Sequence, residues 1–320
     1  MELLEIDNSK RKTYDSCPRK YYYEYIRNLQ RTTGSSAMRY GTVFHAAMEH
    51  GYEYIRLHGW DNSSKMLEAA ILGAKKAWDE ETALYPYFYD DYRNLLNCTI
   101  AVKQYFETFA SDEGFLEVVS PEKAFKIKVT CNLTGFTFYF TGKIDLQIKL
   151  NGRIWGNEFK TSGYSIKQQT ERIQRAPQII GYSYGLKENS PEGELPDGFL
   201  TTLHYLMSKK KKNGEYGKLS IDFGRPPQVF SMWDIRQWRK ALIATVKRIE
   251  QDRETQQYNL NYDNCYQYGR CTFLNLCEQQ VPMGEESLEG YQERIPWNVL
   301  KTVDKENVVV TEESGDYEVT

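Results

Sequence analysis

The chain has 320 residues, of which 27% are charged and 40% hydrophobic, a composition that excludes disordered and fibrous proteins and suits one large or two small domains. The formal charge of -3, taken alone, argues against a nucleic-acid partner, and six cysteines are too few for a disulfide scaffold. The first residues are acidic, and no stretch approaches the ~18 apolar residues of a membrane span. We therefore expect a cytoplasmic protein with no membrane partner.

Apolar residues recur at helical spacing in the first third of the chain, which predicts helices at residues 13–29, 38–58, 64–82 and 92–109. Residues 115–161 then alternate and are rich in Val, Ile, Phe and Thr, which predicts strands. The later predicted elements are a helix near 175–187, strands near 199–208 and 218–224, and an amphipathic helix from about 231 to 253. This order of helices, antiparallel strands and further helices indicates an α+β domain rather than a doubly wound sheet.

Charge is distributed unevenly along the chain. Residues 301–320 contain two lysines and six acidic residues, a net charge of -4, and carry no helix signals, so we expect an acidic flexible tail. Residues 9–40 contain eight basic and two acidic residues, a net charge of +6. The overall charge therefore does not exclude DNA. We expect residues 1–300 to form a single domain, with a helical insertion at about 60–112.

The most informative stretch is a predicted hairpin around Asn151-Gly152, because both positions of such a two-residue turn need positive φ. A turn there pairs Leu150 with Arg153. Counting back along both strands places Asp145 directly opposite Glu158. The apolar side chains of the first strand share its buried face: Ile144, Leu146, Ile148 and Leu150.

The two carboxylates share their strand faces with lysines, which lie opposite each other as Lys143 and Lys160. Like charges in opposite positions destabilise a sheet, unless a divalent cation converts the repulsion of the carboxylates into coordination. A solvated outer face with side chains that turn apart is the alternative. Oxygen ligands favour Mg²⁺ or Mn²⁺ over zinc, and Lys160 would orient or deprotonate a metal-bound water.

At this point the sequence resembles the PD-(D/E)XK nuclease superfamily, and most of all its RecB-type branch, which includes AddB and the CRISPR-associated exonucleases. Gly142–Asp145 resembles the family's Gly-x-x-Asp motif, and Glu158–Lys160 its Glu-x-Lys motif. Gly41–Glu49 resembles the upstream motif that carries a metal-ligating His, and Gln178–Tyr182 resembles the Gln-x-x-x-Tyr helix motif. The matches occur in the family's order over residues 41–182.

The resemblance implies a restriction-endonuclease-like core, in which helices flank a central mixed β-sheet. The implied catalytic residues are Asp145, Glu158, Lys160, Gln178 and Tyr182, and the implied ligands of Mg²⁺ or Mn²⁺ are His45, Asp145 and Glu158. Without the resemblance, His45 with its apolar neighbours would be a core histidine. Gln178 and Tyr182, four residues apart on one helix face, would be an ordinary surface pair.

Three cysteines near the end of the predicted domain, Cys265, Cys271 and Cys277, are separated by five residues each. Zinc sites prefer shorter gaps, and a fourth ligand is missing. The segment around Cys17 resembles the start of the iron–sulfur subset of the family, in which one N-terminal and three C-terminal cysteines hold a [4Fe–4S] cluster. By that resemblance the cluster joins Cys17 to segment 265–277, and zinc is the alternative.

The basic, tyrosine-rich stretch at residues 9–40 is suited to contacts with phosphates and bases. Arg19, Lys20 and Tyr182 are the expected DNA-binding residues. A solvated helix face is the alternative for the basic stretch. The lysine-rich turn Lys209–Lys212 is either a DNA contact or a charged hairpin tip.

The sequence therefore predicts a Mg²⁺- or Mn²⁺-dependent deoxyribonuclease, a RecB-like exonuclease that hydrolyses DNA ends or single strands in repair, recombination or phage replication. The alternative is a non-catalytic iron–sulfur or zinc subunit that binds nucleic acid or a helicase. No Gly-x4-Gly-Lys-Ser/Thr loop occurs, so a helicase or other ATP-driven recombination partner would lie on another chain. The expected setting is the cytoplasm of a bacterium or of a phage-infected host.

Overall fold

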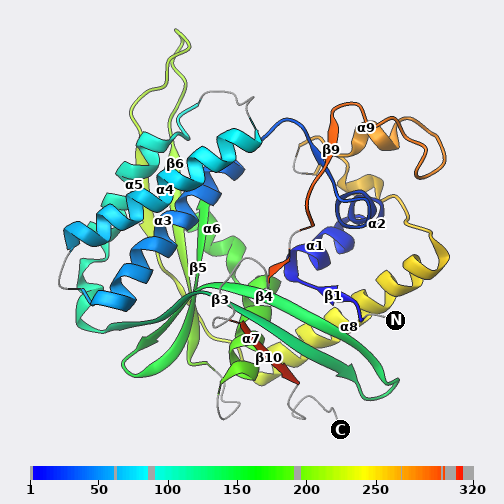
Figure 1. The fold of residues 1–320 in the computed structure, drawn as a ribbon, viewed down its shortest axis with the longest axis horizontal. Helices are drawn as coiled ribbons and strands as arrows, with labels where there is room; N and C mark the ends of the chain where they lie inside the picture. The colour runs from blue at the N-terminus through cyan, green and yellow to red at the C-terminus, as the bar shows by residue number, and fades with distance from the viewer. Residues whose placement is uncertain are drawn as a thin grey trace.

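An eight-stranded sheet runs through the centre of the protein in the computed structural model (Figure 1). The structure describes residues 3–60, 63–85, 91–190, 196–267, 269–296, 298–299 and 308–312. Its strands are β1 (Glu5–Ile6), β3 (Leu116–Cys131), β4 (Phe136–Leu150), β5 (Arg153–Ser162), β6 (Gly198–Met207), β7 (Ser220–Gly224), β8 (Pro227–Gln228) and β10 (Val308–Glu312). Six of them follow the order β10-β3-β4-β5-β6-β7, while β1 pairs with β4 and β8 with β6.

The sheet is mixed, as the resemblance implies. Strand β4 pairs antiparallel with both β3 and β5, whereas β5 pairs parallel with β6. The short strand β1 and the late strand β10 also pair parallel, with β4 and β3 respectively. A mixed sheet flanked by helices is the α+β, restriction-endonuclease-like core that we expected.

One face of the sheet is covered by three helices, α3 (Ser36–His58), α4 (Ser63–Leu84) and α5 (Leu95–Thr108). They confirm the helices predicted at 38–58, 64–82 and 92–109. Val43 and Phe44 of α3 pack with Leu146, Ile148 and Phe159 of the sheet in one buried cluster. This layer brings His45, the residue after Phe44, against β4 in the interior of the sheet.

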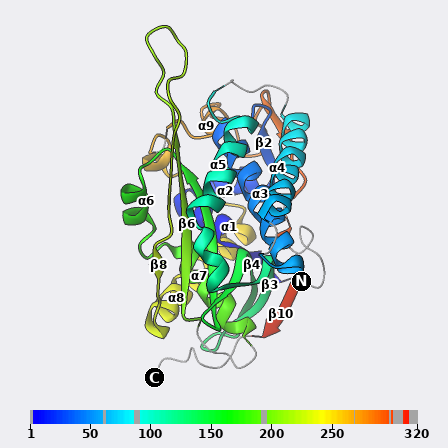
Figure 2. The ribbon, with the colours of Figure 1, turned by 90° about the vertical axis from the view of Figure 1, so that its left-hand side faces the viewer.

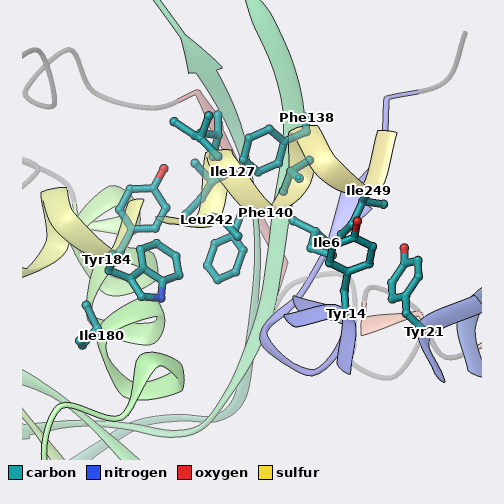
Figure 3. Close-up of a cluster of buried hydrophobic side chains, with 14 of the residues drawn as sticks. Ile6, Tyr14, Tyr21, Ile127, Phe138, Phe140, Ile180, Tyr184, Leu242 and Ile249 are labelled. Atoms are coloured by element: carbon teal, nitrogen blue, oxygen red, sulfur yellow. The ribbon is translucent and has the colours of Figure 1, made fainter. Parts of the chain in front are cut away.

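The other face is covered by α1 (Asn8–Ser16), α7 (Pro177–Asn189) and α8 (Met232–Thr255). Figure 2 shows helices on both sides of β6, with α8 and α6 (Ile166–Ile173) on one side and α5 on the other. Figure 3 shows the second core, in which Phe138 and Phe140 of β4 meet Tyr184 of α7 and Leu242 of α8. The periodicity predicted α7 and α8, but not α6.

The predicted N-terminal helix is interrupted at Cys17. The chain forms α1, then α2 (Pro18–Tyr21) and the π-helical turn η1 (Tyr22–Ile26). Cys17 lies between the first two with extended backbone angles, φ -162° and ψ 113°. The cause is Pro18, because a proline ring disfavours helical angles in the preceding residue.

The C-terminal segment differs from the expected flexible tail in the part that the structure describes. Val308–Glu312 forms β10 and pairs in register with Ala124–Lys128 of β3. The rest of the expected tail lies outside the described residues. The remaining elements are β2 (Leu29–Arg31), which pairs with β9 (Tyr291–Glu293), the 3-10 turns η2 (Ala110–Gly114) and η3 (Tyr262–Asn264), and α9 (Leu274–Cys277).

Candidate active site

The predicted hairpin is confirmed, and it places the carboxylates where two strands separate. Asn151 and Gly152 both have positive φ, 51° and 81°, and Leu150 pairs with Arg153. The β4–β5 ladder ends at the Leu146–Asn157 pair. Asp145 and Glu158 are therefore the first residues beyond the ladder, at the point where β4 turns towards β1 and β5 continues beside β6.

This separation corrects two expectations about the strand faces. Lys143 does not oppose Lys160, because the β4–β5 ladder ends before these residues. Lys143 instead forms an ion pair with Glu122 of β3. Ile144 packs in the core on the α7 side, whereas Leu146 packs on the α3 side. A register shift in β3 between Val118 and Ser120 and the positive φ of Glu122 disturb the regular pleat beside this part of β4.

The carboxylate of Asp145 is buried and contacts the α3 layer. Its Oδ2 atom accepts a hydrogen bond from the Phe159 backbone N–H at 2.8 Å and lies 3.3 Å from Nδ1 of His45. Burial raises the pKa of Asp145, but His45, Lys160 and the Phe159 N–H outweigh it and hold the pKa below its ordinary value. Asp145 is therefore the carboxylate of this site that stays ionised.

The carboxylate of Glu158 is 3% exposed and contacts the α7 layer. Its Oε1 atom accepts hydrogen bonds from Lys160 Nζ at 2.6 Å and from Gln178 Nε2 at 2.8 Å. Its Oε2 atom is buried and has no hydrogen-bond partner among the described residues. Burial, and then the charge of Asp145, raise the pKa of Glu158 to about 7. The pKa values of the two carboxylates are thus shifted in opposite directions, downward for Asp145 and upward for Glu158.

Lys160 keeps its positive charge in this arrangement. Burial lowers the pKa of its ammonium group, but Glu158 and Asp145 outweigh burial and raise the pKa above its ordinary value. A protonated Lys160 donates hydrogen bonds and supplies positive charge. In this structure it is suited to holding Glu158 and a negative substrate group, rather than to accepting a proton.

Gln178 and Tyr182 lie on α7 and are not a solvated surface pair. Gln178 Nε2 donates to Glu158 and also lies 3.2 Å from the Tyr182 hydroxyl. The Tyr182 ring packs against Phe125 and Phe199. The structure thus brings together the residues that the resemblance implied: His45, Asp145, Glu158, Lys160, Gln178 and Tyr182. Their individual catalytic and metal-binding roles stay predictions.

The donor chemistry of the site fits a divalent cation. In the parts of the chain that the structure describes, no three His, Cys, Asp or Glu side chains, here or elsewhere, are arranged to hold an ion. At this site His45 contacts Asp145, and Lys160 contacts Glu158. The buried, unpartnered Oε2 atom of Glu158 is nevertheless costly without a partner. Two carboxylates and an imidazole are ligands for Mg²⁺ or Mn²⁺.

Four cysteines line a second cavity. Cys17, Cys265, Cys271 and Cys277 all line one cavity of about 160 Å³ and form no disulfide. Asn261 and Asn264 fasten the two segments together, because both side chains donate to the Ser16 carbonyl, at 2.8 and 2.7 Å. The cysteine spacing predicted this grouping only through the family resemblance.

The expected DNA-binding residues Arg19 and Lys20 lie at this cysteine cavity. Arg19 Nε donates to the Tyr258 carbonyl at 2.9 Å, and Lys20 lines the cavity itself. Arg19 therefore helps to dock α2 on the segment that follows α8.

Asn8 was not predicted as a site residue, yet its Nδ2 atom donates to the Gln178 carbonyl at 3.3 Å. Asp7 is a residue type that often caps the N-terminus of a helix, so the sequence contains a signal for a helix that begins at Asn8.

Residues 8–278 match the family model of the PD-(D/E)XK nuclease superfamily. The chain belongs to this superfamily. The match covers well over half of the chain and includes every residue of the candidate site and of the cysteine cavity. Membership implies a metal-dependent nuclease, and PD-(D/E)XK nucleases typically use Mg²⁺ or Mn²⁺.

Other comparisons add little to this result. No curated protein matches the chain. A solved structure entitled "Crystal structure of SSO0001" shares 11% identity over 75% of this chain and 84% of its own, with a TM-score of 0.29, which is too low to support any conclusion. Among the described residues, no helix has the length and apolar character needed to cross a membrane.

Proposed function

We propose that this nuclease is a Mg²⁺- or Mn²⁺-dependent deoxyribonuclease of the RecB-like type, which acts as an exonuclease on DNA ends or single strands. The observation that carries the proposal is the buried Oε2 atom of Glu158, which has no protein partner in the described residues and lies beside Asp145 and Lys160. A scaffold has no use for two buried carboxylates side by side, because they repel each other.

Each side chain has a separate task in this proposal. Asp145, Glu158 and His45 would hold the ion, which when bound polarises the phosphate and activates a water molecule. Gln178 and Lys160 fix the Oε1 atom of Glu158, which would leave its Oε2 atom to hold the ion. The charged Lys160 stabilises negative charge that develops on the phosphate.

Asp145→Asn and Lys160→Met test this function. Both variants keep the size of the side chain but remove a ligand charge or the ammonium group, so cleavage of labelled single-stranded and duplex DNA should fall by about two orders of magnitude or more. Lys149→Met, on the same hairpin but exposed and paired with Glu117, is the matched control and should retain activity. Full activity of Asp145→Asn or Lys160→Met in folded protein would refute the mechanism.

We also propose that the four cysteines hold a [4Fe–4S] cluster, with zinc as the alternative. The support is that four sulfur donors from two distant segments line one cavity. Burial raises the pKa of Cys277 to about 11, so the thiol stays protonated unless a metal displaces the proton. Anaerobically purified protein should contain iron and inorganic sulfide in equal amounts and absorb visible light. A colourless sample with stoichiometric zinc would overturn the cluster.

A further inference from the structure

A cavity of about 470 Å³ adjoins the candidate active site, between α1 and the segment that joins α6 to α7. Gln178 lines this cavity and also donates to Glu158 at 2.8 Å, so one side chain connects the two places. The volume lies within the ~300–1,000 Å³ range of sites for small molecules. The cavity can therefore accept a group of about nucleotide size next to the carboxylates.

The fold places α1 at this position through the short strand β1. β1 pairs with Tyr139 and Phe140 of β4, beyond the point where β4 leaves β5. Asp7 then starts α1 by accepting a hydrogen bond from the Lys10 N–H at 2.8 Å. Figure 1 shows α1 beside β1 and β4. The separation of β4 from β5 thus positions both the carboxylates and the wall of the cavity.

The wall of this cavity is rich in positively charged side chains. Arg11, Lys12 and Arg172 line the cavity, and Asp15 is its acidic residue. Arg11 Nε lies 3.4 Å from Asp15, whose charge is shared with Arg248 at 3.0 Å. Lys12 and Arg172 form no ion pair within the described residues. Two exposed cations are thus available to a ligand.

The chemistry of these residues favours an anion that presents two neighbouring oxygen atoms, such as a phosphate. The central carbon of the Arg172 guanidinium lies over the Tyr164 ring, 3.8 Å from its centre, a contact that restrains the guanidinium. An ordered guanidinium suits phosphate oxygens, which it can bind with two parallel hydrogen bonds. Successive phosphates along a nucleic-acid strand would meet Arg172 and Lys12 from the two walls.

We propose that this cavity binds the phosphodiester backbone of a single DNA strand next to the bond that is cleaved, with Lys12, Arg172 and Arg11 as its cationic contacts. This inference rests on the proposed nuclease function. It gives Gln178 a second role, because a phosphate in the cavity would lie beside the residue that positions Glu158. The basic start of α1, rather than Arg19 and Lys20, then guides the strand.

The test is the double variant Lys12→Gln/Arg172→Gln, whose exposed side chains can change without loss of folding. Binding of a fluorescein-labelled thymidine oligonucleotide is followed by anisotropy in EDTA at several salt concentrations. The double variant should bind about tenfold more weakly, and the slope of log affinity against log salt should fall by about 1.4, since each lost phosphate contact contributes about 0.7. In cleavage assays KM should rise while kcat stays unchanged.

The matched control is Lys75→Gln/Lys76→Gln, which removes the same charge from the exposed face of α4. Its affinity and salt slope should remain those of the wild type. Equal affinity in the Lys12/Arg172 double variant and the wild type, or equal weakening by both double variants, would overturn the inference alone. A wild-type protein that cleaves no DNA with Mg²⁺ or Mn²⁺ would instead refute the proposed function itself.

Discussion

Two side chains, those of Glu158 and His204, carry buried polar atoms that have no hydrogen-bond partner among the described residues, and their roles differ. Glu158 contacts Lys160 through its Oε1 atom and interacts with the charge of Asp145, while an ion would satisfy its buried Oε2 atom. His204 of β6 is fully buried, and neither ring nitrogen has a partner among the described residues. Its ring lies 4.4 Å from that of Phe44 and is stacked 4.8 Å from that of Phe223. His204 is therefore a neutral core residue, and it makes folding depend on pH.

The pH dependence has a definite direction. Burial lowers the pKa of His204 from 6.5 to about 3, so between these values the unfolded chain binds a proton that the folded chain does not. Stability is then lost as pH falls below 6.5, by about 2 kcal/mol between pH 7 and pH 5. Urea unfolding at the two pH values should show this loss in the wild type and a smaller loss in His204→Phe.

His58 provides the control for this prediction. It is exposed at the end of α3, and its ring contacts Tyr54. His58→Phe should therefore keep the wild-type difference between pH 7 and pH 5. An unchanged difference in His204→Phe would show that carboxylates, and not this histidine, determine the acid sensitivity.

At the scale of elements, β10 closes the edge of the sheet. Its residues Val308–Glu312 pair with Ala124–Lys128 of β3, and Lys128 Nζ lies 2.9 Å from Glu312. Removal of residues 308–320 should expose the backbone groups of β3 and lower the free energy of unfolding by on the order of 2 kcal/mol. Urea unfolding would measure the loss, and hydrogen exchange should accelerate at 124–128.

A shorter truncation is the matched control. Removal of residues 313–320 leaves every β10 pair in place and should change neither the unfolding midpoint nor the exchange of β3. If both truncations behave alike, β10 does not stabilise the sheet in solution.

The elements also show why prediction succeeded in some places and failed in others. The Asn151-Gly152 turn and the periodic helices α3, α4, α5 and α8 depend on local signals, and they were found. The interruption at Cys17 had a local cause, Pro18, that periodicity alone overlooked. Strands β1 and β10 are short and pair in parallel with distant residues, so no local pattern indicates them. The separation of β4 from β5, which positions Asp145 and Glu158, likewise depends on residues far apart in the sequence, since β4 pairs with β1 and β5 with β6.

At the scale of the whole molecule, the cysteine cavity joins segments 248 residues apart, from Cys17 to Cys265. A cluster that closes this span would stabilise the fold by on the order of 5 kcal/mol, by analogy with a long-loop disulfide. Cys17→Ser should therefore lower Tm and loosen α1, whose Asn8 contacts Gln178. Cys131→Ser, outside the cavity, is the control and should leave Tm unchanged. An unaltered Tm in Cys17→Ser would show that the cysteines do not hold the ends together.

The distance between the two cysteine segments also has a consequence during synthesis. A ribosome adds about 5–20 residues per second, so the 248 residues after Cys17 take roughly 12–50 s to emerge. Throughout that time the segment around Cys17 lacks residues 261–277, on which it docks in the folded protein. The segment around Cys17 therefore reaches its final contacts only after residue 265 has been made, long after Asp145, Glu158 and Lys160 have emerged.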